Sequence, residues 1–404
     1  MLKRTLIFFG LSSMTIVLVA VGYIAMTPNL EITSLKMIVS ALAGSGIKSP
    51  SRELVENRLV TPEGFRLNRY ATAIPGARML LVTAKGDLLV STPRQHQVIL
   101  LARDKDKDGI ADAKRVLLDK LNRPHGLALW REWLYIAETD AIGRVLFDVD
   151  SGRLGGQYER IIEGLPKVGN HWSKSIGFSP DGWLYLSIGS SCNVCVETDV
   201  RRATMMRFRP DGSAGEIVGT GLRNSVGFDW APWDGALYAT DNGRDLMGDD
   251  YPPCELNRIE YGQFYGWPYV NGFGDLDPDE GQGKEAMLLN AVSPVFGFRA
   301  HNAPLGIRFN RSDALPQMYR KSAFVALHGS WNRSSPDGYK LVSLHWDDKE
   351  GITQRDFLTG FEQDGDIIGR PVDVAQGSQG ELYLSDDYSG TIYRIVYMGE
   401  TAVQ

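Results

Sequence analysis

One pattern of two strands joined by a tight turn recurs along most of this chain, about every fifty residues. Its second strand reads Gly-x-Leu-Tyr-x-Ser or a close variant, and the stretch from Gly169 to Gly189 is the clearest copy. The second strands of six copies start at Gly86, Glu132, Gly182, Gly235, Ser322 and Gly380. A period of this length leaves room for four strands in each unit, which is typical of β-propeller blades. The sequence therefore predicts an all-β fold, a six-bladed β-propeller.

The N-terminus differs from this pattern. Lys3 and Arg4 precede an uncharged, largely apolar run from Thr5 to Met26, which is long enough to cross a bilayer as a helix. The basic flank favours export of the remainder, either behind a membrane anchor or behind a cleaved signal peptide. We therefore expect a periplasmic or extracytoplasmic protein that residues 5–26 anchor to the inner membrane. The expected divisions are an anchor or signal peptide (1–28), a linker or peripheral segment (29–60), the propeller (61–398) and a tail (399–404).

The overall charge and the three cysteines limit the possible functions. The formal net charge is −6 and no dense block of Lys and Arg occurs, so a nucleic-acid partner is not expected. Cys192 and Cys195 form a Cys-x-x-Cys pair without a thioredoxin-like βαβ context and without a second pair to complete a zinc site. We interpret them as a loop disulfide or as plain thiols, and Cys254 as an isolated cysteine.

Polar residues precede the first strand of most repeats. In an antiparallel pair, the start of one strand and the end of the next lie at the same edge of the sheet. These polar residues should therefore meet the loops that follow the second strands, at residues 190–195, 241–250 and 328–333, on one face of the ring. Four of the six histidines belong to this set, which predicts a functional site there, although any one of them could be purely structural. The histidines are His125, His171, His301 and His328.

His171 is the best candidate for chemistry on this face. Arg223 and Asn224 stand at the same position of the next repeat. A neighbouring guanidinium favours the neutral form of an imidazole, and a neutral imidazole can take a proton from a hydroxyl group. The alternative for Arg223 is a structural ion pair between blades.

Two acidic stretches could bind calcium, which prefers carboxylate and carbonyl oxygens. The first is the loop 241–250, which contains Asp249 and Asp250 and is followed by Glu255. The second is 104–112, which has acids at alternate positions and a glycine at the sixth, but lacks the terminal Glu of an EF-hand. A solvated acidic loop is the alternative for the first stretch, and a charged turn for the second.

Several stretches together resemble the soluble PQQ-dependent aldose or glucose dehydrogenases, and most closely their branch of L-sorbosone dehydrogenase-like proteins. The similarity covers about residues 61–398. The stretches that carry it are Asn170-His171, residues 221–227, Asn242-Gly243-Arg244, Glu255–Ile259, residues 262–268 and His328–Arg333.

The resemblance implies a propeller that binds PQQ and calcium and oxidises a sugar, a related polyol or an aldehyde. It implies that His171 is the general base while hydride passes to the quinone, with Arg223 and Asn224 beside the cofactor. It also implies that Arg370 pairs with a cofactor carboxylate and that the carbonyls of Gly243 and Arg244 hold calcium. We further place His125, His301, His328 and Arg333 at the cofactor, and Asp249, Asp250 and Glu255 at the metal.

This chain also departs from those enzymes. Asn170 precedes the base where they have an acid, and Val372 stands where they have a second arginine. Two other functions are therefore considered on the same fold, a metal-dependent, lactonase-like hydrolase and a non-enzymatic carbohydrate- or ligand-binding propeller. The electron acceptor is not indicated by the sequence.

Overall fold

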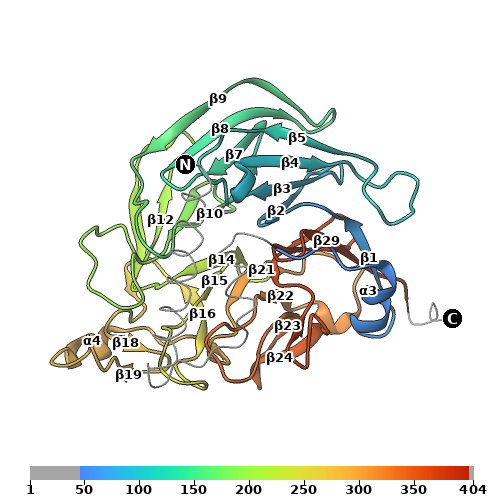
Figure 1. Cartoon of the computed structure of the whole chain (residues 1–404). Coiled ribbons are helices and arrows are strands. Elements are labelled where there is room, and N and C mark those ends of the chain that lie inside the picture. The colour runs from blue at the N-terminus through green and yellow to red at the C-terminus, as the bar shows by residue number, and fades with distance from the viewer. Residues whose placement is uncertain (1–45, 400–404) are drawn as a thin grey trace, which may run out of the picture.

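Each repeat of the sequence forms one antiparallel sheet, and six sheets lie around a ring (Figure 1). The structure is a computed structural model and describes residues 46–399. The predicted membrane span at residues 5–26 lies outside the described residues. Within residues 46–399, no helix is both long and apolar enough to span a membrane. The six-bladed β-propeller predicted from the repeats is confirmed.

The first three blades follow one another along the chain. Blade one contains β2 (Leu80–Val82), β3 (Leu88–Thr92), β4 (Gln97–Leu101) and β5 (Lys114–Leu118). Blade two contains β6 (Leu127–Trp130), β7 (Trp133–Ala137), β8 (Ala141–Asp148) and β9 (Arg153–Glu163). Blade three contains β10 (Lys174–Phe178), β11 (Leu184–Ile188), β12 (Thr204–Phe208) and β13 (Glu216–Thr220), and the short β17 (Gln263–Phe264) pairs in parallel with β13.

The other three blades complete the ring. Blade four contains β14 (Ser225–Trp230), β15 (Leu237–Asp241), β16 (Cys254–Ile259) and β20 (Phe296–Phe298). Blade five contains β21 (Pro304–Phe309), β22 (Ser322–Leu327), β23 (Lys340–Asp347) and β24 (Gly351–Leu358). Blade six contains β27 (Pro371–Gln376), β28 (Leu382–Asp386), β29 (Thr391–Tyr397) and β1 (Phe65–Ala71).

The recurring sequence pattern corresponds to the second strand of every blade, namely β3, β7, β11, β15, β22 and β28. These strands are almost fully buried, and every residue of β3, β15, β22 and β28 is buried. A strand covered on both faces by neighbouring blades needs apolar side chains on both, which explains the nearly continuous apolar runs. The first strands contact one another in order around the centre, so the residues before them meet there.

Blade six combines the first and the last strand of the described chain. Strand β1 pairs with β29, from Phe65 opposite Tyr397 to Ala71 opposite Ile392, and the two lie side by side in Figure 1. Tyr70 of β1 is fully buried and packs edge-on against Tyr383, with ring centroids 4.9 Å apart. Because β1 supplies the outer strand of the last blade, residues near both termini close the ring.

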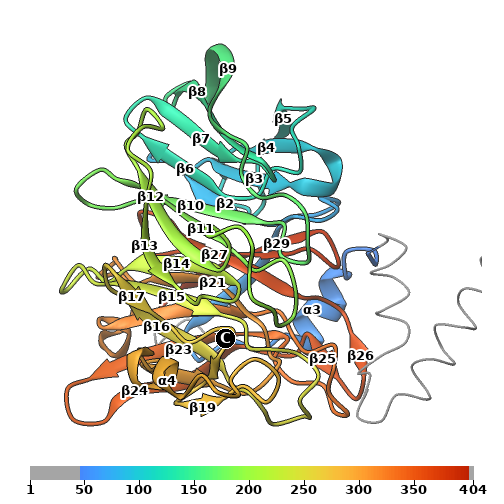
Figure 2. The same cartoon turned by 90° about the vertical axis from the view of Figure 1, so that its left-hand side faces the viewer.

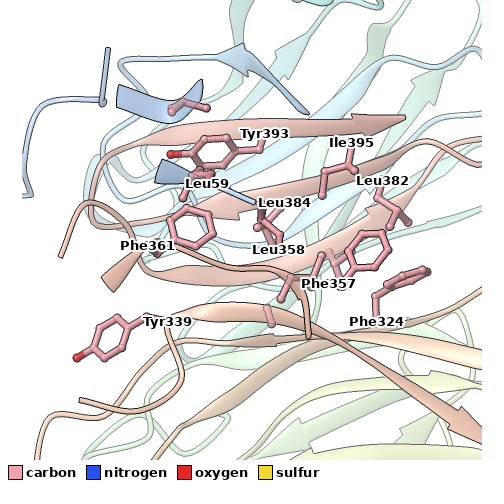
Figure 3. Packing of buried hydrophobic residues seen from close by; sticks show 14 of the residues in the cluster. Leu59, Phe324, Tyr339, Phe357, Leu358, Phe361, Leu382, Leu384, Tyr393 and Ile395 are labelled. Atoms are coloured by element: carbon pink, nitrogen blue, oxygen red, sulfur yellow. The ribbon is translucent and has the colours of Figure 1, made fainter. Parts of the chain in front are cut away.

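A short helix packs against this closure. Helix α3 (Arg52–Arg58) starts at Ser51, whose hydroxyl accepts a hydrogen bond from the backbone N–H of Leu54. Leu59, just after the helix, joins the apolar cluster between blades five and six, which Figure 3 shows with Phe357, Phe361 and Tyr393. Figure 2 shows α3 beside the hairpin formed by β25 (Glu362–Gln363) and β26 (Asp366–Ile367).

The long insertion predicted near residues 261–287 lies between β16 and β20. It contains β17, the hairpin of β18 (Val270–Asn271) and β19 (Asp275–Leu276), and helix α4 (Glu285–Asn290). Arg244 fixes the insertion to the loop after β15 through an ion pair with Asp277, Nη1 to Oδ1, at 2.6 Å. Two short 3-10 helices, η1 (Pro93–Gln95) and η2 (Gln317–Tyr319), complete the regular elements of the described residues.

Candidate active site

A cavity of about 370 Å³ lies near the centre of the ring, where the residues before the first strand of each blade meet the loops that follow the second strands. Sequence analysis predicted this face as the functional one, and the structure brings together several of the predicted residues there. Those that line the cavity are His171, Arg223, Asn224, Gly243, His301 and His328. The volume is within the range of small-molecule sites, roughly 300–1,000 Å³.

Ser190 orients the imidazole of His171. Nδ1 of His171 lies 3.0 Å from the carbonyl oxygen of Ser190 and 2.9 Å from its hydroxyl oxygen. A carbonyl can only accept a hydrogen bond, and the Ser190 hydroxyl already donates its proton to the carbonyl of Cys192 at 2.7 Å. Nδ1 must therefore carry the ring proton of neutral His171. Nε2 is then left with its lone pair, which is the form that a base needs.

The surroundings of His171 keep it neutral. Burial lowers the pKa of this imidazole to about 3, and the nearby Arg223 guanidinium adds to the effect. Both causes disfavour the charged form of a histidine. The sequence-based expectation of a neutral imidazole beside a cation thus agrees with the electrostatics of the cavity.

Arg223 is held in place by the neighbouring loops. Its Nη2 donates to the side-chain oxygen of Asn193 at 2.8 Å and forms an ion pair with Asp245 at 2.9 Å. Its Nε donates to the Asn193 carbonyl at 2.9 Å, and its Nη1 donates to the Asn242 carbonyl at 3.1 Å. A buried guanidinium with this many partners is fixed in orientation. The alternative considered from the sequence was an ion pair between blades, whereas the ion pair with Asp245 lies within blade four. The same guanidinium lines the cavity.

The loop after β11 supplies the contacts to both His171 and Arg223. The sequence predicted that this loop lies on the functional face, but not that Ser190 and Asn193 hold these two side chains. Cys192 and Cys195 form a disulfide across the loop, as one of the two sequence interpretations predicted. Ser190 lies just before the disulfide and contacts His171, whereas Asn193 lies inside it and contacts Arg223. A signal was present, because the Cys-x-x-Cys pair directly follows the second strand of blade three.

His301 and His328 line the cavity on the side of blade five. Nε2 of His301 lies 2.8 Å from the carbonyl of Gly248. Nε2 of His328 lies 2.9 Å from a carboxylate oxygen of Asp387, which also forms an ion pair with Arg78 at 2.8 Å. Burial lowers the pKa of His328 to about 4, with Arg370 as the second cause.

Two of the residues assigned to the cofactor lie beside the cavity without lining it. His125 is fully buried, with Nδ1 3.2 Å from the carbonyl of Lys174. Arg370 donates to the carbonyls of His328 and Gly329, at 3.1 and 2.9 Å. The Arg370 guanidinium therefore supports the loop that carries His328.

Arg333 and three of the predicted metal ligands, Arg244, Asp249 and Asp250, are not in the cavity lining. Arg333 donates to the carbonyl of Asp249 and forms an ion pair with Asp250 at 3.3 Å. The carboxylate of Asp249 accepts hydrogen bonds from Ser334. The side chain of Arg244 binds Asp277.

Glu255, which is half-buried, lies opposite the buried Asp241, its cross-strand partner on β15. Burial raises the pKa of Asp241 to about 7, and burial together with Asp241 raises the pKa of Glu255 to about 8. In the described part of the chain, neither carboxylate forms an ion pair with Lys or Arg. The side-chain oxygens of Asn242 and Asn257 are also buried without a hydrogen-bond partner. Two adjacent carboxylates and two unsatisfied amide oxygens fit the oxygen ligands that calcium prefers.

The second acidic stretch lies away from the cavity, between β4 and β5. Carboxylate oxygens of Asp104, Asp106 and Asp108 lie within 4.8 Å of one another. Asp104 also forms an ion pair with Arg394 of β29 at 2.9 Å. This loop therefore joins blade one to blade six, and the prediction of a calcium site here stays a prediction.

Comparison with known proteins gives the family. The family model described as TrAA12-like matches residues 59–258 and 278–398, and the gap between the two matched ranges falls almost entirely in the insertion after β16. An uncharacterised protein of Borreliella burgdorferi is 35% identical, over 69% of this chain and 76% of that protein. An aldose sugar dehydrogenase of Escherichia coli is 26% identical, again over 69% and 76%.

Other relatives are named as PQQ-dependent enzymes. A PQQ-dependent pyranose dehydrogenase of Coprinopsis cinerea is 24% identical over 84% of this chain, which spans 55% of that longer protein. The holo form of its PQQ domain superposes with a TM-score of 0.72 at 20% identity, covering 87% of this chain and 98% of that domain. A calcium structure of a Trichoderma reesei AA12 enzyme gives a TM-score of 0.75 at 20% identity, covering 84% and 97%. These structures confirm the fold, and the matched family model confirms the resemblance: the chain belongs to the TrAA12-like family.

Proposed function

We propose that this protein is a PQQ- and calcium-dependent dehydrogenase that oxidises an aldose sugar or a related polyol or aldehyde. The observation that carries the proposal is His171, whose Nε2 has a free lone pair at a cavity that Arg223 and Asn224 also line. The named dehydrogenases among the relatives of the chain support the same class of reaction.

The cavity suits PQQ in size and charge. PQQ is a flat, anionic quinone that carries carboxylates, and the lining contains four arginines, Arg78, Arg94, Arg123 and Arg223. When bound, PQQ supplies the two-electron acceptor that sugar oxidation requires. The protein's part is to orient the reactants and to move the proton.

His171 is the proposed proton acceptor. Oxidation of a sugar hydroxyl releases the hydroxyl proton, and Nε2 of His171 takes it while Nδ1 stays bonded to Ser190. The resulting imidazolium is disfavoured by burial and by Arg223, so it releases the proton readily for the next turnover. Arg223 presents a fixed positive charge to the cavity, where it would stabilise negative charge that develops on an oxygen.

Calcium is proposed to bind between Asp241 and Glu255. Asp241 accepts a hydrogen bond from the backbone N–H of Asn224, so a cation there would fix the segment that carries Arg223 and Asn224. The carbonyls of Gly243 and Arg244 stay the proposed ligands of a calcium beside the cofactor, where it would act as a Lewis acid.

The test is a dye-linked activity assay on purified protein with a panel of aldoses. We expect turnover only after both PQQ and calcium are added, and loss of turnover in His171→Ala. Hydrolysis of lactones by the protein in the absence of PQQ would instead support the hydrolase. The cavity favours the dehydrogenase, because its two lining aspartates, Asp245 and Asp387, are each paired with an arginine rather than left to converge on a metal.

Export is part of the proposal. The disulfide between Cys192 and Cys195 suits an oxidising compartment such as the periplasm. The apolar run at residues 5–26 is proposed to direct the chain there and to anchor it to the inner membrane.

A further inference from the structure

The cavity lining carries an excess of positive charge. Its arginines are Arg78, Arg94, Arg123 and Arg223, and its carboxylates are Asp245 and Asp387. Each carboxylate is paired with an arginine, Asp245 with Arg223 and Asp387 with Arg78. Two guanidiniums, those of Arg94 and Arg123, are therefore left without a carboxylate in a chain whose formal net charge is −6.

These two arginines stand on one wall of the cavity, formed by blades one and two. Arg94 belongs to η1, just after β3, is exposed, and has no hydrogen-bond or ion-pair partner in residues 46–399. Arg123 precedes β6, and its guanidinium carbon lies 3.6 Å from the centre of the Trp172 ring. Trp172 follows His171 directly, so the wall adjoins the proposed base.

The arginines of this wall destabilise one another. Burial lowers the pKa of the Arg123 guanidinium, and the charges of Arg94 and Arg78 lower it further. Like charges grouped at a cavity are costly unless an anion binds between them, and guanidinium groups match carboxylates in shape and charge. Arg370, which the sequence assigned to a carboxylate, donates to backbone carbonyls of the loop that carries His328.

We propose that Arg94 and Arg123, with Arg78 behind them, form a subsite that binds carboxylate groups. The inference rests on the proposed function for the identity of its ligand, but not for its existence. The carboxylates would belong either to the bound quinone cofactor or to an acidic sugar, such as a uronic acid, that serves as substrate.

The first measurement uses calorimetric titration with pyridine-2,3-dicarboxylate, a small dicarboxylate without a quinone. We expect wild type to bind it, Arg94→Gln and Arg123→Gln each to bind about ten-fold or more weakly, and Arg123→Lys to retain part of the affinity. Arg66→Gln is the matched control, because Arg66 is an exposed arginine on β1, outside the cavity. Thermal unfolding midpoints close to that of wild type establish that each variant is folded. Equal affinities of wild type and folded Arg94→Gln and Arg123→Gln, or no binding by wild type, would overturn the subsite.

The second measurement identifies the source of the carboxylate. PQQ is titrated directly into the same proteins, and dye-linked KM values are compared for glucose and glucuronate. Weaker PQQ binding in Arg94→Gln and Arg123→Gln supports a role toward the cofactor. Unchanged PQQ binding with a KM raised only for glucuronate supports a role toward the substrate. If PQQ affinity and both KM values match those of wild type, the assignment of the subsite to cofactor or substrate carboxylates is overturned, although the proposed function stands. Dicarboxylate binding that depends on the arginines, in a protein that binds no PQQ, would uphold the subsite and contradict the proposed function.

Discussion

Ser190 determines what His171 can do. A histidine that donates from Nδ1 to a carbonyl keeps Nε2 as an acceptor, and the two oxygens of Ser190 enforce this arrangement. The resemblance noted from the sequence implies an acid just before the base, where this chain has Asn170. Here the backbone and hydroxyl of a neighbouring loop orient the imidazole, and sequence spacing alone does not reveal such a contact.

At the residue scale, His171→Gln separates chemistry from binding. We expect this variant to lose about 100-fold or more of its turnover, because a positioned base contributes that much to proton transfer. Affinity for PQQ should change little, because the arginines that line the cavity remain. The check is dye-linked turnover alongside direct PQQ titration. Substantial turnover by folded, PQQ-loaded His171→Gln would remove the histidine from the mechanism.

The protonation of His171 can be followed directly. With a pKa lowered to about 3, the imidazole should stay neutral as the pH falls from 8 to about 4, whereas an ordinary histidine titrates near pH 6.5. The measurement is an NMR titration of the protein with ¹³C-labelled histidine and without PQQ, and His171→Gln identifies the signal. A midpoint near pH 6.5 would contradict the electrostatic account of this site.

At the element scale, the loop after β11 is the unit that positions the site. Its disulfide joins Cys192 to Cys195, and Asn193 between them bonds both Arg223 and the backbone N–H of Asp245. From the sequence, the pair was interpretable only as a staple or as thiols, because its partners come from blade four.

We therefore expect Asn193→Ala to lower turnover by on the order of ten- to hundred-fold, since a small displacement of a positioned group is costly in catalysis. Reduction of the disulfide between Cys192 and Cys195 should also lower turnover. Val196→Ala, at an exposed position of the same loop, is the control and should resemble wild type. The readout is kcat against KM at saturating PQQ and calcium. If Asn193→Ala had the kcat of wild type, the loop would be only a structural connection.

The pairing of β15 with β16 brings Asp241 and Glu255 together, so stabilisation by calcium should depend on pH. Protons compete with the cation for Asp241 and Glu255, because their pKa values are raised to about 7 and 8. Stabilisation by calcium should therefore be small at pH 6 and grow as the pH rises to 9. At a concentration one hundred times its dissociation constant, calcium would add about 2.7 kcal/mol to the free energy of unfolding.

Thermal unfolding with and without calcium, at several pH values, tests this site. Glu255→Gln should remove most of the pH-dependent gain. Asp106→Asn, in the acidic loop between β4 and β5, is the control that separates the two candidate sites. A gain that persists in Glu255→Gln would place the calcium elsewhere.

At the scale of the whole molecule, the repeat predicted most of the architecture. Six apolar second strands mark six blades, because each must be buried on both faces, and their spacing leaves room for the remaining strands. The closure of the ring was not predicted. Strand β1 lies far from β29 in the sequence, and no local pattern distinguishes a strand that completes the last blade.

The same repeat predicted the location of the site better than it predicted which residues line the site. The backbone topology alone brings the residues before the first strands to one face. The sequence therefore predicted that His171, Arg223 and Asn224 lie there, and all three line the cavity. The directions of long side chains depend on neighbours from other blades. Arg370 and Arg333 therefore lie near the predicted site but bind loop carbonyls, whereas Arg94 and Arg123 line the cavity and were missed.

The central claim is that this cavity binds PQQ. Its most direct test is a titration of purified protein with PQQ in the presence of calcium, followed by the absorbance of the quinone and by dye-linked turnover of the same samples. We predict saturable binding at micromolar PQQ with one equivalent per chain, and turnover that rises in proportion to the bound fraction. Absence of binding at micromolar PQQ with calcium present would contradict the account.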